Sequence, residues 1–332
     1  MKKQLVKMIS LVLALIMIIS VTGCAPAAPA TTAATTTAKT TAGGALVKAV
    51  FISQDMSNAS QAFSQKQFLA YDENYGFDVS VVDSKGDVKT EAELIDASIA
   101  QGVKVIFINP NDIKASAQAL QKAKEAGIIV GLFSSDLAPE FQKYRDFYCG
   151  VDDSEAGKLA AKAFIEHFPN GAKIVEVGGQ FNHGAQILRH DSFNKAIAGT
   201  KIEVIDYKAT QLWDSAQAMA IMDSMIAKEG DQIQGVYCHW DEGCLGVIEA
   251  LKSANRMKDM FIVGVDGNRH GFMQVANGEQ AVTLAQNFTT MSKKTMELAR
   301  ALLDGKTIEK VNWIPLDVVT KDNVAKFPTP EW

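Results

Sequence analysis

The chain has 332 residues, a formal net charge of −5 and a composition that is 47% hydrophobic and 21% charged. The length is sufficient for two domains. No run of basic residues is present, so the sequence offers no electrostatic footprint for a nucleic acid.

The first 24 residues predict export from the cytoplasm. A short basic segment (1–7) precedes an apolar run of 14 residues (8–21), which is too short for a comfortable membrane span and suits a signal-peptide core. The run leads into VTGC (21–24), which resembles the lipobox of bacterial lipoproteins. We therefore expect residues 1–23 to be removed and Cys24 to carry a lipid. An ordinary signal peptide or an N-terminal anchor helix are the alternatives, and both also place the body outside the cytoplasm.

The segment 24–45 follows as a tether. Beyond Cys24 it consists of Ala, Thr, Pro and Gly with a single charge, a composition from which no hydrophobic core can be built. We expect it to connect the lipid to the folded body.

The body alternates short apolar runs with amphipathic helical patterns, which predicts an α/β fold with parallel sheets covered on both faces. About ten strands are expected, enough for two sheets in two lobes joined by short hinges. The predicted strands are 47–53, 77–83, 103–109, 128–134, 146–152, 172–178, 202–208, 235–240, 260–266 and 281–287.

Polar and aromatic residues collect where these strands end. Ligands of open α/β sheets bind beyond the carboxyl ends of the strands, and planar polar side chains suit sugar hydroxyls because they both donate and accept hydrogen bonds. Trp213 precedes Asp214 and Ser215, which are typical helix-start residues. Its indole could stack on the apolar face of a sugar ring, or it could simply pack between helix and sheet.

The sequence lacks the common catalytic and cofactor-binding motifs of enzymes. No G-x-S-x-G elbow, Walker loop, dinucleotide fingerprint or i, i+4 histidine pair occurs, so we expect neither an enzyme nor a cofactor or metal site. With Cys24 lipidated, three cysteines remain, Cys149, Cys238 and Cys244. Buried free thiols are the favoured interpretation, although one disulfide stays open. The adjacent acids Asp241 and Glu242 are expected to form a solvated helix start.

Four segments carry a family resemblance: INP (108–110), YCGVDDSEAG (148–157), WDSAQ (213–217) and VGVDG (263–267). From about Val47 to the C-terminus the body resembles the ribose- and galactose/glucose-binding proteins of bacterial sugar ABC transporters. The resemblance implies the type I periplasmic-binding-protein fold, with two doubly wound parallel-sheet lobes joined by three hinge crossings. The N-terminal lobe would hold 46–151 and 288–316, and the C-terminal lobe 152–287 and 317–332.

The resemblance also assigns ligand-binding residues, position by position. In the family an arginine stands four residues before an aromatic residue, as Arg189 does before Phe193, and the galactose/glucose branch places a histidine six residues before that arginine. The residues that match family positions are Asn58, His183, Arg189, Trp213, Asp266 and Gln286.

Other positions depart from the family pattern and leave the exact sugar open. The usual Asp-Arg pair after the fourth strand is replaced by Ser134-Ser135, with Asp136 next. His239-Trp240-Asp241 stands where relatives carry Asn-Asn-Asp or Gln-Asn-Asp, so the stacking platform could have moved to Trp240. The first loop has Ser60-Gln61 in place of an aromatic pair. We therefore add five residues to the expected site: Gln61, Ser134, Ser135, Asp136 and Trp240.

The implied mechanism is a hinged clamp that closes over a monosaccharide, an aldohexose or an aldopentose, and docks on a membrane permease driven by a separate ATPase. The resemblance favours a monomer that is held by lipidated Cys24 at the outer face of the membrane. A sensor that presents its ligand to a chemoreceptor or kinase is the alternative, and a polyol or autoinducer-2 is an alternative ligand. A lac-repressor-type regulator shares the two-lobed core but carries a DNA-binding headpiece where this chain has a signal peptide.

Overall fold

A computed structural model describes residues 45–332, which form one compact unit. The predicted signal peptide (1–23), the predicted lipidation site Cys24 and the predicted tether up to residue 44 lie outside the described residues.

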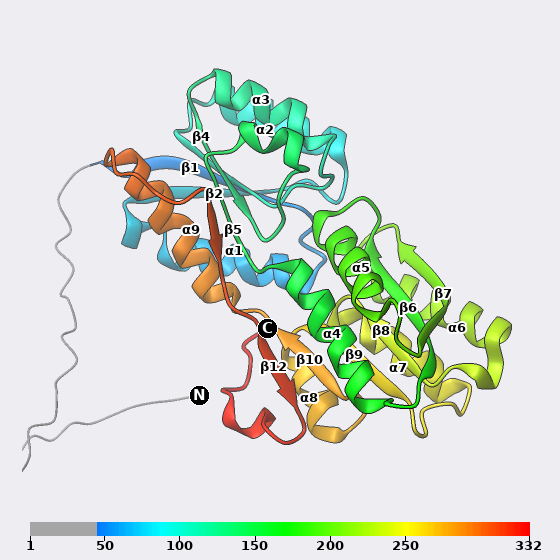
Figure 1. Ribbon diagram of the computed structural model, residues 1–332. Helices are drawn as coiled ribbons and strands as arrows, with labels where there is room; N and C mark the ends of the chain where they lie inside the picture. Colours follow the sequence, from blue (N-terminus) through cyan, green and yellow to red (C-terminus); the bar gives the residue numbers. More distant parts are fainter. Residues whose placement is uncertain (1–44) are drawn as a thin grey trace, which may run out of the picture. The chain divides into compact units, whose positions relative to one another are not determined.

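The described chain forms two sheets of six strands each (Figure 1). The first sheet has the order β11-β5-β4-β3-β1-β2, with β1 (Val47–Ser53), β2 (Phe77–Asp83), β3 (Val105–Ile108), β4 (Ile129–Phe133), β5 (Phe147–Gly150) and β11 (Val311–Trp313). The second has the order β12-β10-β9-β8-β6-β7, with β6 (Ala172–Gln180), β7 (Ile202–Thr210), β8 (Gly235–Cys238), β9 (Phe261–Asp266), β10 (Val282–Ala285) and β12 (Asp317–Thr320).

All neighbouring strands are parallel except β10 and β12, which run antiparallel. The expectation of two parallel-sheet α/β lobes is therefore confirmed, and each of the ten predicted strands is present with ends shifted by a few residues. The short edge strands β11 and β12 were missed. Most of their residues are exposed or half-buried, so they lack the apolar run that marks the other strands.

Helices cover both faces of each sheet (Figure 1). On the first sheet, α1 and α9 share one hydrophobic core while α2 and α3 share the other; on the second, α4 and α5 lie opposite α6 and α7. The helices are α1 (Ala59–Tyr71), α2 (Val88–Ala100), α3 (Ser116–Glu125), α4 (Asp153–His167), α5 (Gly184–Ile197), α6 (Ser215–Glu229), α7 (Asp241–Ser253), α8 (Arg269–Asn277) and α9 (Phe288–Leu303). Short 3-10 turns lie at η1 (Glu73–Tyr75), η2 (Pro139–Tyr144), η3 (Gly230–Gln232) and η4 (Val324–Lys326).

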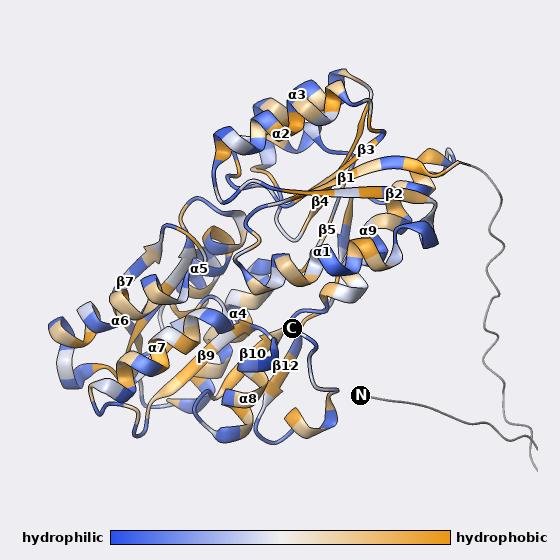
Figure 2. Ribbon diagram, turned by 180° about the vertical axis from the view of Figure 1, so that it is seen from behind, coloured by the Kyte–Doolittle hydropathy of each residue, from blue (hydrophilic) through white to orange (hydrophobic). Residues whose placement is uncertain are grey.

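Helix starts follow from capping side chains. The helices that begin behind Asn58, Asp152, Asp214, Asn268 and Asn287 each have a first-turn backbone N–H bonded to that residue's side-chain oxygen. The hydropathy of each element reflects how it is buried. The inner strand β9 is apolar along most of its length, whereas the surface helices α2 and α3 alternate between apolar and polar residues (Figure 2).

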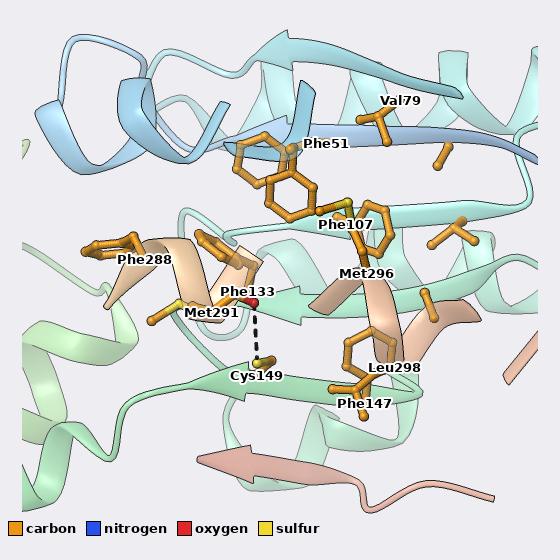
Figure 3. Packing of buried hydrophobic residues seen from close by; sticks show 14 of the residues in the cluster. Phe51, Val79, Phe107, Phe133, Phe147, Cys149, Phe288, Met291, Met296 and Leu298 are labelled. Atoms are coloured by element: carbon orange, nitrogen blue, oxygen red, sulfur yellow. Dashed lines mark hydrogen bonds between the residues drawn. The ribbon is translucent and has the colours of Figure 1, made fainter. Parts of the chain in front are cut away.

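The core between the first sheet and α9 joins segments that are far apart in sequence (Figure 3). Phe51, Phe107 and Phe133 of the sheet pack with Met291 and Met296 of α9, and the Cys149 thiol lies 3.8 Å from the Met291 carbonyl oxygen. Phe51 also stacks on Phe68 of α1, with ring centroids 4.3 Å apart. The first sheet is therefore covered on this face by α1 and α9 together.

The chain passes three times between the sheets. The first crossing follows β5, since the next helix, α4, packs on the second sheet. The second follows β10, since α9 packs on the first sheet, and the third lies between β11 of the first sheet and β12 of the second. These passages lie side by side at one end of both sheets, next to the carboxyl ends of the strands (Figure 1).

Candidate ligand-binding site

Side chains from both sheets meet around a small cavity of about 30 Å³. Fourteen residues line it, most of them at strand ends or helix starts: Gln54, Asn58, Ser60, Gln61, Asn109, Ser134, His183, Ala185, Arg189, Trp213, Trp240, Asp266, Gln286 and Phe288. Nine of the eleven residues predicted from sequence are among them. The structure does not bring Ser135 and Asp136 to this cavity.

The loop after β1 supplies Asn58, and the first turn of α1 supplies Ser60 and Gln61. The Asn58 side-chain oxygen caps α1 by accepting from the Ser60 backbone N–H at 2.8 Å and from its hydroxyl at 2.7 Å. Gln61 is buried beside Ser53, whose hydroxyl donates to the Gln61 amide oxygen at 3.5 Å. These bonds use only the amide oxygens of Asn58 and Gln61, and both residues line the cavity.

His183 caps α5 and is fixed in one tautomer. Its Nδ1 accepts from the Ala185 N–H at 3.3 Å, so the ring proton lies on Nε2, which faces the Asn109 side-chain oxygen at 3.4 Å. Burial lowers the pKa of His183 to about 3, and the nearby positive charge of Arg189 adds to the effect. His183 is therefore a neutral donor at physiological pH.

Arg189 lies at the base of the cavity in a buried ion pair. Its Nε donates to Asp153 Oδ1 at 2.8 Å, and its Nη1 donates to the His239 backbone carbonyl. Burial alone would lower the pKa of Arg189, but the carboxylates of Asp153 and Asp266 raise it. The guanidinium is therefore held charged and oriented by bonds in which Nη2 takes no part, and the residue lines the cavity.

Two indoles form the aromatic part of the lining. Trp213 meets Trp240 edge to face at 5.4 Å and His183 edge to face at 5.3 Å, and the Arg189 guanidinium lies 5.8 Å from its ring. One side of Trp213 presses on Gly179, where a Cβ atom would collide with the indole. Trp213 thus packs on the sheet and borders the cavity at the same time, which combines both interpretations drawn from sequence.

Asp266 and Gln286 form the wall contributed by β9 and the end of β10. Gln286 Nε2 donates to Asp266 Oδ1 at 2.9 Å, and its backbone N–H donates to the Asp266 carbonyl. Burial raises the pKa of Asp266 well above its usual value, while Arg189 counteracts this. Asp266 also has φ = 123°, a region that side-chain-bearing residues rarely adopt.

The segment after β4 departs from the prediction beyond its first residue. Ser134 has φ = 65° and lines the cavity, but this left-handed residue turns the chain, so that Ser135 is buried against Gly184. Asp136 instead binds Arg145 through two hydrogen bonds of 2.6 and 2.7 Å. Its carboxylate serves the first lobe rather than the cavity.

A second expectation is wrong: Asp241 is not part of a solvated helix start. The side chain is fully buried and accepts hydrogen bonds from the Gly267 N–H, Gln280 and Thr283, at 2.7–2.8 Å. Burial raises the pKa of Asp241 to about 6. This carboxylate ties the start of α7 to the loop after β9, directly behind Asp266.

Sequence reasoning missed five lining residues: Gln54, Ser60, Asn109, Ala185 and Phe288. Gln54 is the first residue beyond β1, so a strict rule of taking the residue next to each strand end would have found it. Asn109 would have been missed even so, because the predicted strand 103–109 included it, whereas β3 ends at Ile108. Phe288 gave no such signal, because it starts α9 and also packs in the core of the first sheet.

The expectation of buried free thiols is confirmed for Cys149, Cys238 and Cys244. Within residues 45–332, no cluster of three His, Cys, Asp or Glu side chains could hold a metal ion. In that same range, no helix has both the length and the apolar character needed to cross a bilayer.

Comparison with known proteins gives concordant matches. The periplasmic binding protein domain model matches residues 49–307. The ribose import binding protein of Bacillus subtilis (strain 168) is 28% identical over 246 residues, covering 74% of this chain and 78% of the relative. The xylitol-binding protein of Mycolicibacterium smegmatis is 28% identical over 246 residues, covering 73% of this chain and 68% of the relative.

The fold is matched by solved structures. A galactofuranose binding protein superimposes with a TM-score of 0.80 at 21% identity, covering 84% of this chain and 96% of the other. The relatives are binding proteins rather than enzymes, as expected from the sequence. Because the family model covers most of the chain, including the strand ends that line the cavity, this protein belongs to the periplasmic binding protein domain family.

Proposed function

We propose that this protein captures a monosaccharide, an aldohexose or an aldopentose, between its two lobes and delivers it to the permease of an ABC transporter. One observation carries the proposal. The Trp240 indole N–H and the Gln286 amide oxygen are buried, line the same cavity and have no hydrogen-bond partner within residues 45–332. A buried donor and a buried acceptor without partners are costly, and a hydroxyl group can satisfy both.

The charge of the lining favours a neutral ligand. Arg189 is the positive group, but Asp153 neutralises it, and Asp266 adds a further carboxylate nearby. A carboxylate or phosphate ligand would therefore meet no uncompensated positive charge. A neutral polyhydroxyl compound can hydrogen-bond to the guanidinium and amide groups and pack its apolar face against the indole rings.

The cavity volume indicates that the lobes must separate for entry. A cavity of about 30 Å³ is far smaller than the roughly 300–1,000 Å³ of typical small-molecule sites. The lining comes from both sheets, so a ligand held there contacts both lobes and favours the arrangement in which they approach each other. The domain division 46–151 with 288–316, and 152–287 with 317–332, is part of this proposal and is supported by the distribution of strands between the sheets.

The relatives support the class of ligand and the transport role. One is named as a ribose import binding protein and another as a xylitol-binding protein, so a polyol belongs in any test beside the aldoses. Anchoring through Cys24 at the outer face of the membrane rests on the lipobox resemblance. It would raise the local concentration of the binder near its permease.

The test is calorimetric titration of residues 45–332 with D-ribose, D-xylose, D-glucose, D-galactose, xylitol, myo-inositol and autoinducer-2. We expect tight one-to-one binding of a single aldose, and loss of that signal in Trp213→Ala. Trp313→Ala is the matched control, because this exposed indole does not line the cavity. Tight binding of autoinducer-2 or a polyol alone would contradict the aldose assignment, and silence across the panel from ligand-free folded protein would contradict the sugar class.

A further inference from the structure

The two lobes are joined directly by hydrogen bonds at the turn that ends β6. The Gln54 side chain donates to the Gln180 amide oxygen, and Gln180 Nε2 lies 3.5 Å from the Asn111 backbone carbonyl oxygen. The Ile113 N–H donates to the Asn182 carbonyl oxygen at 3.4 Å. These bonds connect the second sheet directly to the strand ends of the first.

Gln180 is held firmly by the second lobe. It is the last residue of β6, is paired in register with Thr210 of β7, and its own carbonyl accepts the His183 N–H at 3.1 Å. The side chain is 4% exposed, yet it does not line the ligand cavity. Both polar atoms of its amide bond to the first lobe: the oxygen accepts from Gln54, and the nitrogen donates to the Asn111 carbonyl.

The groups that receive Gln180 are fixed within the first lobe. The Asn111 backbone N–H and side-chain Nδ2 each donate to Glu91 Oε2 at 2.8 Å, and Nδ2 also donates to the Ser84 hydroxyl at 2.8 Å. The Ser84 hydroxyl in turn donates to the Gln54 carbonyl at 2.8 Å. The four side chains are almost fully buried, so the receiving surface is ordered before Gln180 reaches it.

We propose that Gln180 is a closure latch: a positioning residue that holds the lobes together in the ligand-free protein and so sets how far the open state is populated. This rests on the two-lobed capture proposed above. Two buried hydrogen bonds exchanged for water when the lobes part would shift the closed-to-open ratio about tenfold. Gln180 would thereby tune ligand affinity without touching the ligand.

The test measures lobe separation directly. Spin labels at Lys89→Cys on α2 and Lys195→Cys on α5 report the distance between the lobes by pulsed electron resonance, and the native cysteines are buried and leave the labelling specific. In ligand-free residues 45–332, Gln180→Ala should shift the distribution toward longer distances, with the closed-to-open ratio falling about tenfold. Gln180→Glu, which sets a buried carboxylate oxygen against the Asn111 carbonyl oxygen in place of the donor, should shift the distribution at least as far.

Gln186→Ala is the matched control. Gln186 is equally buried, but it bonds to Tyr207 within the second lobe, so its loss should leave the distances unchanged. Distances in Gln180→Ala identical to those of the unsubstituted protein would overturn the latch. Thermal unfolding of each variant separates misfolding from opening. The measurement needs no ligand, so it stands or falls independently of whether the cargo is a sugar.

Discussion

Arg189 and Asp153 form an ion pair with an Nε···Oδ1 distance of 2.8 Å, and both side chains are less than 5% exposed. The pair links α5 to the first residue of α4, which follows the first passage between the sheets. Because breaking a buried pair leaves an uncompensated charge, Asp153→Ala should reduce the free energy of unfolding by about 3–5 kcal/mol. Urea denaturation measures this.

The control is Glu155→Ala on the same helix. Glu155 pairs with Lys158 at 3.3 Å, but both side chains are about half exposed, so its loss should cost less than about 1 kcal/mol. Equal losses of unfolding free energy in the two variants would show that the buried Arg189–Asp153 pair stabilises the protein no more than an exposed pair does.

Trp213→Ala should weaken ligand binding at least tenfold, that is by about 1.4 kcal/mol or more, with little loss of stability, because the indole is only half-buried. Arg189→Ala should weaken binding to a similar degree, and it should also destabilise the protein because it strands Asp153. Calorimetric titration beside urea denaturation separates the two effects. Normal affinity in both variants would remove these residues from the site.

Gly179→Ala should displace the Trp213 ring while leaving every residue that lines the cavity chemically unchanged, because Gly179 is not one of them. A Cβ at this position would occupy the space of the Trp213 ring, and the backbone φ of Gly179 is not among the positive values. We expect a shift of tryptophan fluorescence and a loss of affinity like that of Trp213→Ala. A variant with unchanged fluorescence would mean that the strand, rather than the indole, gives way.

Glu91→Gln should remove a pH dependence of stability. Burial raises the pKa of Glu91 to about 7, although hydrogen bonds from Ser116 and Asn111 oppose the rise. The folded state therefore holds the proton more tightly than the unfolded chain, and this contribution is complete below about pH 4.5 and lost as the pH rises to about 7. Relative to Glu91→Gln, the unsubstituted protein should lose about 3 kcal/mol of unfolding free energy across that window.

Urea denaturation at several pH values tests this, with Glu93→Gln as the control, since Glu93 is an exposed glutamate on the same helix. Parallel stability curves for the unsubstituted protein and Glu91→Gln would indicate that Glu91 is ionised in the folded state.

The three cysteines of the described residues should resist alkylation in the native protein. Burial raises the pKa of the Cys149 thiol to about 11 and that of Cys244 well above its ordinary value, so reactive thiolate is scarce. Labelling by iodoacetamide followed by mass spectrometry should find modification only in urea. Ser253→Cys, on the exposed end of α7, supplies a positive control, and rapid native labelling of Cys149 would contradict its burial.

The sequence was sufficient to predict the alternation of strands and helices, because the inner strands of both sheets, such as β3, β5, β8 and β9, are buried on both faces and read as apolar runs. It also identified most of the cavity, since ligand-binding residues follow strand ends. The prediction of site residues failed after Ser134, where a single backbone angle sets the direction of the chain. Because Ser134 has a left-handed φ, Ser135 packs against Gly184 and Asp136 binds Arg145. It failed at Asp241 because the partners that make burial tolerable, Gln280 and Thr283, come some forty residues later.

The return of α9 to the first sheet has a consequence for biosynthesis. Phe288, Met291 and Met296 complete a core that also contains Phe51 and Phe133, so a nascent chain ending before residue 288 exposes aromatic side chains of the first sheet to solvent. The first lobe cannot finish folding before the second has been made, which raises the average sequence separation of its contacts and slows its folding.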